Sequence, residues 1–202
     1  MKFFKPPIKK VDFSSIVYEP LGESVYVKPI SMFYQENHKN KKWDIVKSFD
    51  SVSILLFDSS KQAFVIVRQF RPAVFFNNPK DGYTYELCAG LADKNKSLEE
   101  IASEEVLEEC GYEILPSQLH FIGSFLNSTG MSGSKQFLYF AEVNDACRVN
   151  DGGGIEDECI EVLYLSLEDS LEFIFDESFQ KTTSLFLGIH WYHYSYKSKG
   201  KI

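Results

Sequence analysis

The chain of 202 residues has no long apolar run and no excess of positive charge. No apolar stretch approaches the roughly 18 residues of a membrane-spanning helix. The N-terminus, MKFFKPPIKK, carries lysines without an apolar segment, so a secretory signal is not expected. The formal net charge of -8 argues against general nucleic-acid binding, which needs a basic surface. We therefore expect no membrane and no nucleic-acid partner.

Cysteine is also sparse, and its spacing excludes two kinds of site. The four cysteines contain no CxxC pair, so neither a zinc site nor a disulfide framework is indicated. We expect reduced thiols in a cytoplasmic protein. The apolar content of 44% and charged content of 25% are ordinary for a globular chain that can build a sizeable core.

An acidic helix is predicted over residues 98–110. Ser97 and Glu100 form a capping-box pattern at its start, and Gly111 supplies the left-handed residue that commonly ends a helix. Several of its glutamates stand four residues apart, which costs roughly 0.2–0.5 kcal/mol for each pair, and the helix carries no basic residue to offset them. A solvated acidic face is the ordinary explanation for such a pattern.

The placement of three of these acids favours a different explanation. At about 100° per residue, Glu105, Glu108 and Glu109 converge within roughly a third of the helix circumference, beside apolar positions such as Val106. Glu108 and Glu109 also lie in the last turn, where the helix dipole disfavours negative charge. Carboxylates beside a core-facing stripe need a compensating cation, and Mg²⁺ prefers such oxygen ligands.

The rest of the sequence predicts strands before and after this helix and two further helices near the C-terminus. Pro6, Pro7 and Pro20 break any regular element in residues 1–20, which we expect to form a loose lead-in. Residues 24–33 and 43–49 predict a hairpin across the polar turn ENHKNKK. Further strands are expected at 51–58, 63–70, 83–88, 119–126, 136–143 and 159–165, and helices at 167–175 and 181–194.

This order predicts an α/β fold in which a mixed sheet is packed between helical layers. Residues 1–48 are expected to form an N-terminal β-hairpin appendage with a role in dimerisation, and residues 49–202 the main domain. The triple glycine at 152–154 does not lie between a strand and a helix, so it predicts a hinge rather than a phosphate cradle.

The stretch GLADKNKSLEEIASEEVLEECGY matches a known motif. The pattern is Gly, five residues, Glu, seven residues, Arg-Glu-apolar-x-Glu-Glu-x-Gly-apolar, and the positions in register are Gly90, Glu105, Val106, Glu108, Glu109, Gly111 and Tyr112. The flanking segments VRQFRPAVF and YELCAGLAD extend the match. The chain thus resembles the Nudix hydrolase superfamily over about residues 24–196. Within it, the nucleotide-sugar branch is the most similar, particularly animal UDP-sugar pyrophosphatases, with ADP-ribose pyrophosphatases as relatives.

The resemblance implies a Nudix-type α/β/α sandwich that uses Mg²⁺, with Mn²⁺ as a possible substitute. It implies that Glu105 and Glu109 ligate the metal together with the backbone carbonyl of Ala89, and that the catalytic Glu108 lies close by. A further acid from a loop is expected at the metal, where it ligates or activates water. Glu158 aligns best with that acid, and Glu156 and Asp157 remain alternatives.

Four more residues are expected to bind substrate. Arg71, in preference to Arg68, is placed to grip phosphate with a bidentate guanidinium. Glu86 is expected to contact the substrate or to support the site. Gly130 lies in a loop that can offer backbone donors, with plain flexibility as the alternative. Trp43 can stack on a base across a dimer, with ordinary packing as the alternative.

Two positions depart from the motif. Lys96 stands where the family usually has Glu, and Glu104 where it usually has Arg. Because both signs are reversed, we hypothesise that these two residues face each other as a charge-swapped pair. In the family, the arginine at the position of Glu104 helps to orient the catalytic glutamates. This chain has no arginine there to do so.

The resemblance predicts an enzyme, a magnesium-dependent hydrolase that cleaves the pyrophosphate of a nucleoside diphosphate sugar by attack of water. UDP-glucose is the favoured substrate, with UMP and glucose 1-phosphate as products. The alternatives are hydrolysis of ADP-ribose and a catalytically weakened nucleotide-binding module. The family builds homodimers through its N-terminal strands, so a dimer with sites formed partly between subunits is expected.

Overall fold

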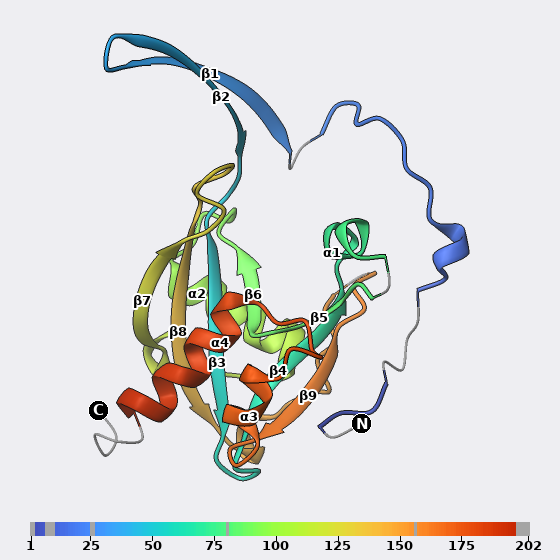
Figure 1. Cartoon of the computed structure of the whole chain (residues 1–202). Coiled ribbons are helices and arrows are strands. Elements are labelled where there is room, and N and C mark those ends of the chain that lie inside the picture. Colours follow the sequence, from blue (N-terminus) through green and yellow to red (C-terminus); the bar gives the residue numbers. More distant parts are fainter. Residues whose placement is uncertain (1–2, 7–10, 25–26, 80, 156, 197–202) are drawn as a thin grey trace.

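The structure, a computed structural model, describes residues 3–6, 11–24, 27–79, 81–155 and 157–196 (Figure 1). Its strands are β1 (Lys28–Glu36), β2 (Lys39–Lys47), β3 (Ser51–Asp58), β4 (Ala63–Phe70), β5 (Tyr83–Glu86), β6 (Cys88–Leu91), β7 (His120–Leu126), β8 (Lys135–Val143) and β9 (Glu161–Ser166). Its helices are α1 (Pro72–Asn77), α2 (Leu98–Glu105), α3 (Ser170–Phe175) and α4 (Thr183–Trp191). Five short turns of helix are η1 (Phe13–Ser15), η2 (Val106–Cys110), η3 (Pro116–Gln118), η4 (Asp145–Cys147) and η5 (Tyr192–Tyr196).

Seven strands form a mixed sheet in which β3 and β8 are parallel and the other pairs are antiparallel. Strand β3 pairs with β4 only at its end, through Leu56, Phe57 and Asp58. Earlier along β3, strand β6 takes the neighbouring position, and β5 pairs with the later part of β4. The two central strands therefore diverge, and the β5–β6 segment fills the opening between them.

Helices cover both faces of this sheet, as the sequence predicted. In Figure 1, α2 lies behind the sheet and α3 and α4 lie in front of it. Alternate residues of β3 point to opposite faces, so Ile54 and Leu56 join the core under α2 while Leu55 and Phe57 join the core under α4. The expected α/β/α arrangement is thus confirmed.

The acidic helix has the predicted ends. The Ser97 hydroxyl accepts from the Glu100 N–H at 3.2 Å, and the Glu100 carboxylate accepts from the Ser97 N–H at 2.8 Å. Gly111 ends the helix with φ 76°. The last turn, η2, is a π-helix, a widened turn that is frequent at functional sites.

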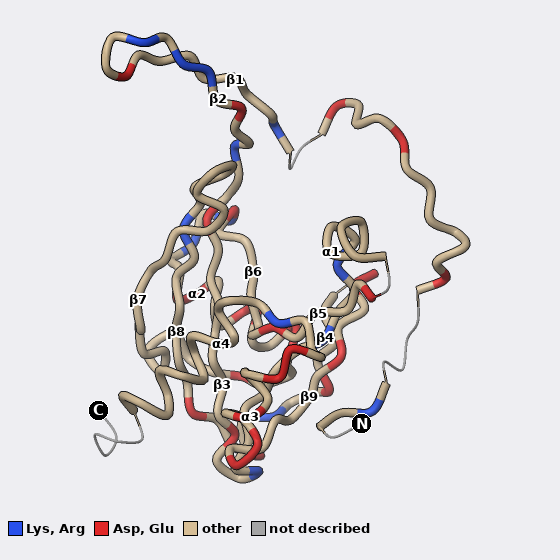
Figure 2. Tube along the Cα trace, viewed as in Figure 1, with Lys and Arg blue, Asp and Glu red and all other residues tan. Residues whose placement is uncertain are grey.

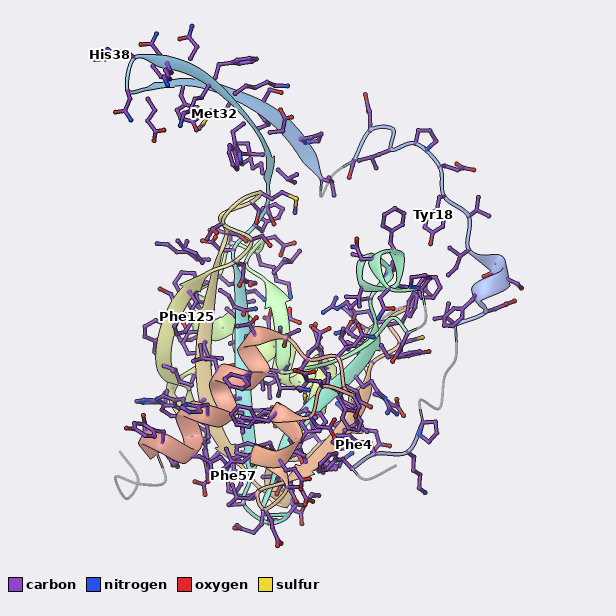
Figure 3. The ribbon with its side chains drawn as sticks, in the orientation of Figure 1. Phe4, Tyr18, Met32, His38, Phe57 and Phe125 are labelled. Carbon is purple, nitrogen blue, oxygen red and sulfur yellow. The ribbon has the colours of Figure 1, made fainter. Side chains whose placement is uncertain are left out.

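The N-terminal hairpin of β1 and β2 forms a separate two-stranded sheet that projects from the body of the molecule (Figures 1 and 3). Lysines gather along it (Figure 2). Its turn is only Asn37 and His38, both with positive φ, so most of the predicted polar turn is strand instead. A two-residue turn of this kind matches the twist of the flanking strands.

Other sequence predictions need correction. The lead-in is not uniformly loose, because Phe4 is buried in the core beside Phe173 and Tyr85. Residues 72–77 form α1, which the sequence did not predict; Pro72 at its first position favours a helix start there. The single strand expected at 83–88 is two strands, because the chain passes from pairing with β4 to pairing with β3.

The two C-terminal helices begin later than predicted, at Ser170 and Thr183. Within the described residues, no helix has the length and apolar character that crossing a membrane requires.

Candidate functional site

Glu109 lies at the buried side of η2, against the start of β6. Its carboxylate accepts a hydrogen bond from the Ala89 N–H at 3.0 Å. Burial raises the pKa of Glu109 to about 8, and the nearby charges of Glu105 and Glu158 act in the same direction, against the hydrogen bonds from Ala89 and Cys88. In these surroundings the hydrogen bonds offset only part of the free-energy cost of ionising the Glu109 carboxyl group.

Glu105, one turn earlier, lies directly against Gly90. A Cβ atom built on Gly90 would lie 2.1 Å from Glu105 Cδ, so only glycine leaves room for this carboxylate. Burial raises the pKa of Glu105 to about 7, with a further contribution from Glu108. The motif glycine Gly90 therefore leaves the space that the side chain of the motif glutamate Glu105 occupies.

A lysine that the sequence analysis did not single out reaches this carboxylate. Lys94 Nζ lies 3.9 Å from Glu105 Oε1 and 3.3 Å from Glu104 Oε2. Lys96 also pairs with Glu104, so the hypothesised charge-swapped pair is present. Nothing in the sequence marked Lys94, because the loop before the helix has no periodicity that fixes side-chain direction.

The triple-glycine segment closes onto the end of the acidic helix. The Gly153 N–H donates to the Glu109 carbonyl at 2.9 Å and the Gly154 N–H donates to the Glu108 carbonyl at 3.0 Å. A Cβ on Gly152 would lie 2.3 Å from the Glu109 carbonyl oxygen. The segment therefore caps the helix end, and the hinge stays a prediction.

The same segment leads to the predicted loop acid. Glu158 is exposed, and its carboxylate accepts from the Ile155 N–H at 3.0 Å. Its charge contributes to the raised pKa of both Glu105 and Glu109, which places it on the same side of the molecule as those two acids. Asp157 is described and exposed, whereas Glu156 lies outside the described residues.

Arg71 and Glu86 pair with each other beside this cluster. Arg71 Nε and Nη2 donate to the two carboxylate oxygens of Glu86 at 2.8 and 2.7 Å. Thr84 also donates to Glu86, which is buried. The pKa of Arg71 is raised, mainly by the hydrogen bonds to Glu86 and also by the charges of Glu109 and Glu158.

Arg68, the alternative to Arg71, is buried and held elsewhere. Its side chain is 1% exposed and pairs with Glu161 at 2.7 Å. It has no exposed face to offer a ligand, so Arg71 is the better placed of the two arginines.

Trp43, in the middle of β2, contacts Gly130 of the loop between β7 and β8. Trp43 Nε1 donates to the Gly130 carbonyl at 2.8 Å, and the Val46 N–H donates to the Met131 carbonyl at 2.9 Å. These bonds fix the hairpin to the β7–β8 loop. Within the described ranges, no hydrogen bond or ion pair joins either residue to the carboxylate cluster.

The carboxylates form a donor set that suits a hard divalent cation. Glu105 and Glu109 bring carboxylate oxygens close together, and their raised pKa values show that Lys94 and the Ala89 N–H only partly offset burial and the neighbouring negative charges. In the part of the chain that the structure describes, no group of three or more His, Cys, Asp or Glu side chains is already arranged around a metal position.

A cavity of about 320 Å³ opens next to these residues. It is lined by Glu86, Leu87, Ala89, Asn127, Gln136, Lys181, Thr182, Thr183 and Ser184. The sequence analysis named only Glu86 and Ala89 of this set. Apart from Leu87, which lies between β5 and β6, the others come from the end of β7, from β8 and from the start of α4, which only the folded chain brings together.

Comparisons with known proteins agree with this geometry. The family model described as NUDIX domain matches residues 47–196. The chain is 39% identical to the uridine diphosphate glucose pyrophosphatase NUDT14 of Bos taurus, over 84% of this chain and 89% of that protein. It is 36% identical to the GDP-mannose pyrophosphatase of Cronobacter sakazakii, over 67% of this chain and 68% of that protein.

A solved structure shows the same fold. It is described as a crystal structure of ADP compounds hydrolase, and it superposes with a TM-score of 0.67 at 18% identity, covering 91% of this chain and 94% of the other.

Proposed function

This chain belongs to the NUDIX domain family and is a hydrolase of pyrophosphate bonds, and we propose that it cleaves nucleoside diphosphate sugars with Mg²⁺ as its cofactor. UDP-glucose is the first candidate substrate, and its products would be UMP and glucose 1-phosphate. The observation that carries this proposal is the pair of carboxylates, the half-buried Glu105 and the buried Glu109, set against Gly90 and Ala89 with raised pKa values.

Glu105 and Glu109 hold the metal in this proposal, with the Ala89 carbonyl as a further ligand and Mn²⁺ as a possible substitute. A bound divalent ion neutralises the pyrophosphate, polarises the phosphorus and lowers the pKa of a bound water. The Ala89 N–H orients the Glu109 carboxylate, and Gly90 leaves the space that Glu105 occupies.

The remaining site residues have roles in positioning and proton transfer. Glu108 lies on the same helix end and supports the cluster. Glu158 approaches from its loop as the acid that ligates the metal or accepts a proton from water, in preference to Asp157. Arg71 binds a phosphate oxygen while Glu86 holds its guanidinium in place.

The N-terminal hairpin supports a homodimer. It projects from the body and exposes apolar side chains, among them Met32, Phe33 and Trp43. A second copy can cover these side chains, and Trp43 with Gly130 would then reach a substrate base from the subunit boundary. Light scattering at micromolar concentration should give the mass of two chains, and a monomer would contradict this proposal.

All four cysteines are free, which supports a reducing compartment such as the cytoplasm. Two alternative substrates are ADP-ribose and GDP-mannose, the latter because bacterial relatives carry that name. A catalytically weakened binding module is a further alternative, prompted by Lys96 and Glu104. The retention of Glu105, Glu108 and Glu109 favours the enzyme.

Product analysis with UDP-glucose, ADP-ribose and GDP-mannose in Mg²⁺ tests the proposal. We expect UMP and glucose 1-phosphate from UDP-glucose, formed fastest of the three reactions. Faster hydrolysis of ADP-ribose or GDP-mannose would identify that compound as the preferred substrate in place of UDP-glucose. Binding without turnover of any of the three would favour the binding module.

A further inference from the structure

The cavity beside Ala89 and Glu86 has a lining that differs from the carboxylate cluster. Asn127 follows β7 and Gln136 lies on β8, so two neighbouring chain segments each present a side-chain amide. Both residues are half-buried, and no described residue hydrogen-bonds to either amide. Each amide can both donate and accept, so together they can recognise hydroxyl groups of a ligand.

Hydroxyl groups face them from the start of α4. Thr182, Thr183 and Ser184 line the same cavity. Thr182 occupies the N-cap position, but its side chain makes no capping hydrogen bond. The first N–H groups of a helix lack intrahelical partners, so this end of α4 adds donors to the hydroxyls.

The cavity offers little free positive charge. Its one cation is Lys181, whose ammonium donates to the carbonyl oxygens of Asp176 and Phe179, the latter at 2.8 Å. Burial lowers the pKa of Lys181. The Lys181 ammonium is therefore already hydrogen-bonded to backbone carbonyls. We expect a phosphate group to bind Arg71 and the metal rather than this cavity.

The lining of this cavity also contains no aromatic ring among its described residues. A nucleobase usually gains part of its binding free energy from stacking on an aromatic side chain. Amides and hydroxyls without a stacking surface suit a polyhydroxylated group better than a base. A volume of about 320 Å³ is sufficient for a small ligand fragment.

From this lining we propose that the cavity is the subsite for the sugar of the nucleoside diphosphate sugar, recognised through its hydroxyls by Asn127 and Gln136. The inference rests on the proposed function, because the pyrophosphate at Glu105 and Glu109 brings the attached sugar to the cavity mouth at Ala89. A second cavity shares Asn127, Gln136, Thr183 and Ser184 and continues to Phe125, Leu126, Leu138 and Leu187, so an aromatic ring borders this continuation although none of the described residues that line the first cavity is aromatic. This apolar extension provides contact for the C–H face of the sugar.

The test compares the two products as competitive inhibitors, since each product carries one arm of the substrate. Asn127→Ala and Gln136→Ala are made separately, with Gln118→Ala as a control for the loss of an amide that does not line the cavity. Each variant should weaken inhibition by glucose 1-phosphate about five- to tenfold, the effect of one neutral hydrogen bond. Inhibition by UMP should remain within about twofold of wild type, and the thermal midpoint of each variant establishes that it is folded.

Two results would overturn the sugar subsite. Unchanged inhibition by both products in folded variants would show that the cavity does not contact the substrate. Weakened inhibition by UMP alone would assign the cavity to the nucleoside. If wild type hydrolyses no nucleoside diphosphate sugar, the proposed function fails instead, and binding of glucose 1-phosphate in Mg²⁺, measured by calorimetry, still decides whether Asn127 and Gln136 contact a sugar.

Discussion

Lys96 and Glu104 form an ion pair in which both signs are the reverse of the Nudix pattern. Lys94 joins the pair at 3.3 Å from Glu104 and continues to Glu105 at 3.9 Å. The chain therefore keeps a cation beside Glu105, although the motif arginine is absent. Positive charge comes from the loop before α2 instead of from the helix itself.

Reversing one member of this pair should weaken the site. Lys96→Glu places a second carboxylate beside Glu104, next to Glu105. Glu104→Arg places a third cation beside Lys94 and Lys96. Since an exposed pair contributes about 0–1 kcal/mol, each single variant should lower Mg²⁺ affinity and rate by up to about fivefold. The double variant should recover most of the loss. If the single variants leave affinity and rate untouched, the charge-swapped pair has no role in the site.

Gly90→Ala should abolish most activity while the fold is kept. The added Cβ would overlap Glu105 Cδ, and the flexible glutamate can move away at small cost to stability. Gly22→Ala is a matched control, because a Cβ at Gly22 meets nothing within 4 Å. Hydrolysis rate and thermal midpoint, measured together, separate a loss of activity from a loss of stability. An active Gly90→Ala enzyme would contradict the placement of Glu105.

Gly152→Ala should destabilise the protein and lower activity together. Gly152 has φ 64°, and its Cβ would lie 2.3 Å from the Glu109 carbonyl, where neither backbone can yield easily. The left-handed conformation alone costs about 1–2 kcal/mol for a residue other than glycine. Denaturant unfolding against the Gly22→Ala control measures the loss. A free energy of unfolding equal to that of the control would show that the 152–154 segment does not pack tightly against the helix end.

Asp58 should make stability depend on acid pH. Burial by itself raises the pKa of Asp58, but hydrogen bonds from Tyr112 and Lys61 outweigh it and hold the pKa below its ordinary value. The stabilisation is therefore present above about pH 4, the unfolded-state pKa, and is lost as pH falls through the lower folded-state pKa. Unfolding of Asp58→Asn from pH 2.5 to 6 should show a weaker rise of stability with pH than wild type. The exposed Glu19→Gln is the control, and an unchanged pH slope in Asp58→Asn would contradict the assignment.

The sequence predicted the fold where local signals and burial agree. The run SVSILLFD alternates between two cores, and the ends of the acidic helix follow from Ser97 and Gly111. It did not predict α1, or the change of partner between β5 and β6, because strand pairing depends on distant segments. The burial of Phe4 was missed for the same reason, since its neighbours Phe173 and Tyr85 are far away in sequence.

The candidate site was predictable to the extent that a motif carries it. Gly90, Glu105 and Glu109 were marked by spacing and are brought together by the structure. Lys94 and the amides of Asn127 and Gln136 were not marked, because a lysine in a loop or an amide near a strand end has no pattern of its own. The triple glycine was noticed, but its contact with the helix end required the folded loop.

Glu109, which accepts a hydrogen bond from the Ala89 N–H, is the residue that we propose as the main ligand of the metal on which hydrolysis depends. The most direct measurement is the rate of UDP-glucose hydrolysis as a function of Mg²⁺ concentration for wild type, Glu109→Gln and the exposed control Glu113→Gln. We predict that Glu109→Gln loses at least about a hundredfold in rate, a loss typical of removing a group that stabilises the transition state, while Glu113→Gln keeps the wild-type curve. Full turnover by Glu109→Gln at the wild-type Mg²⁺ requirement would contradict the account.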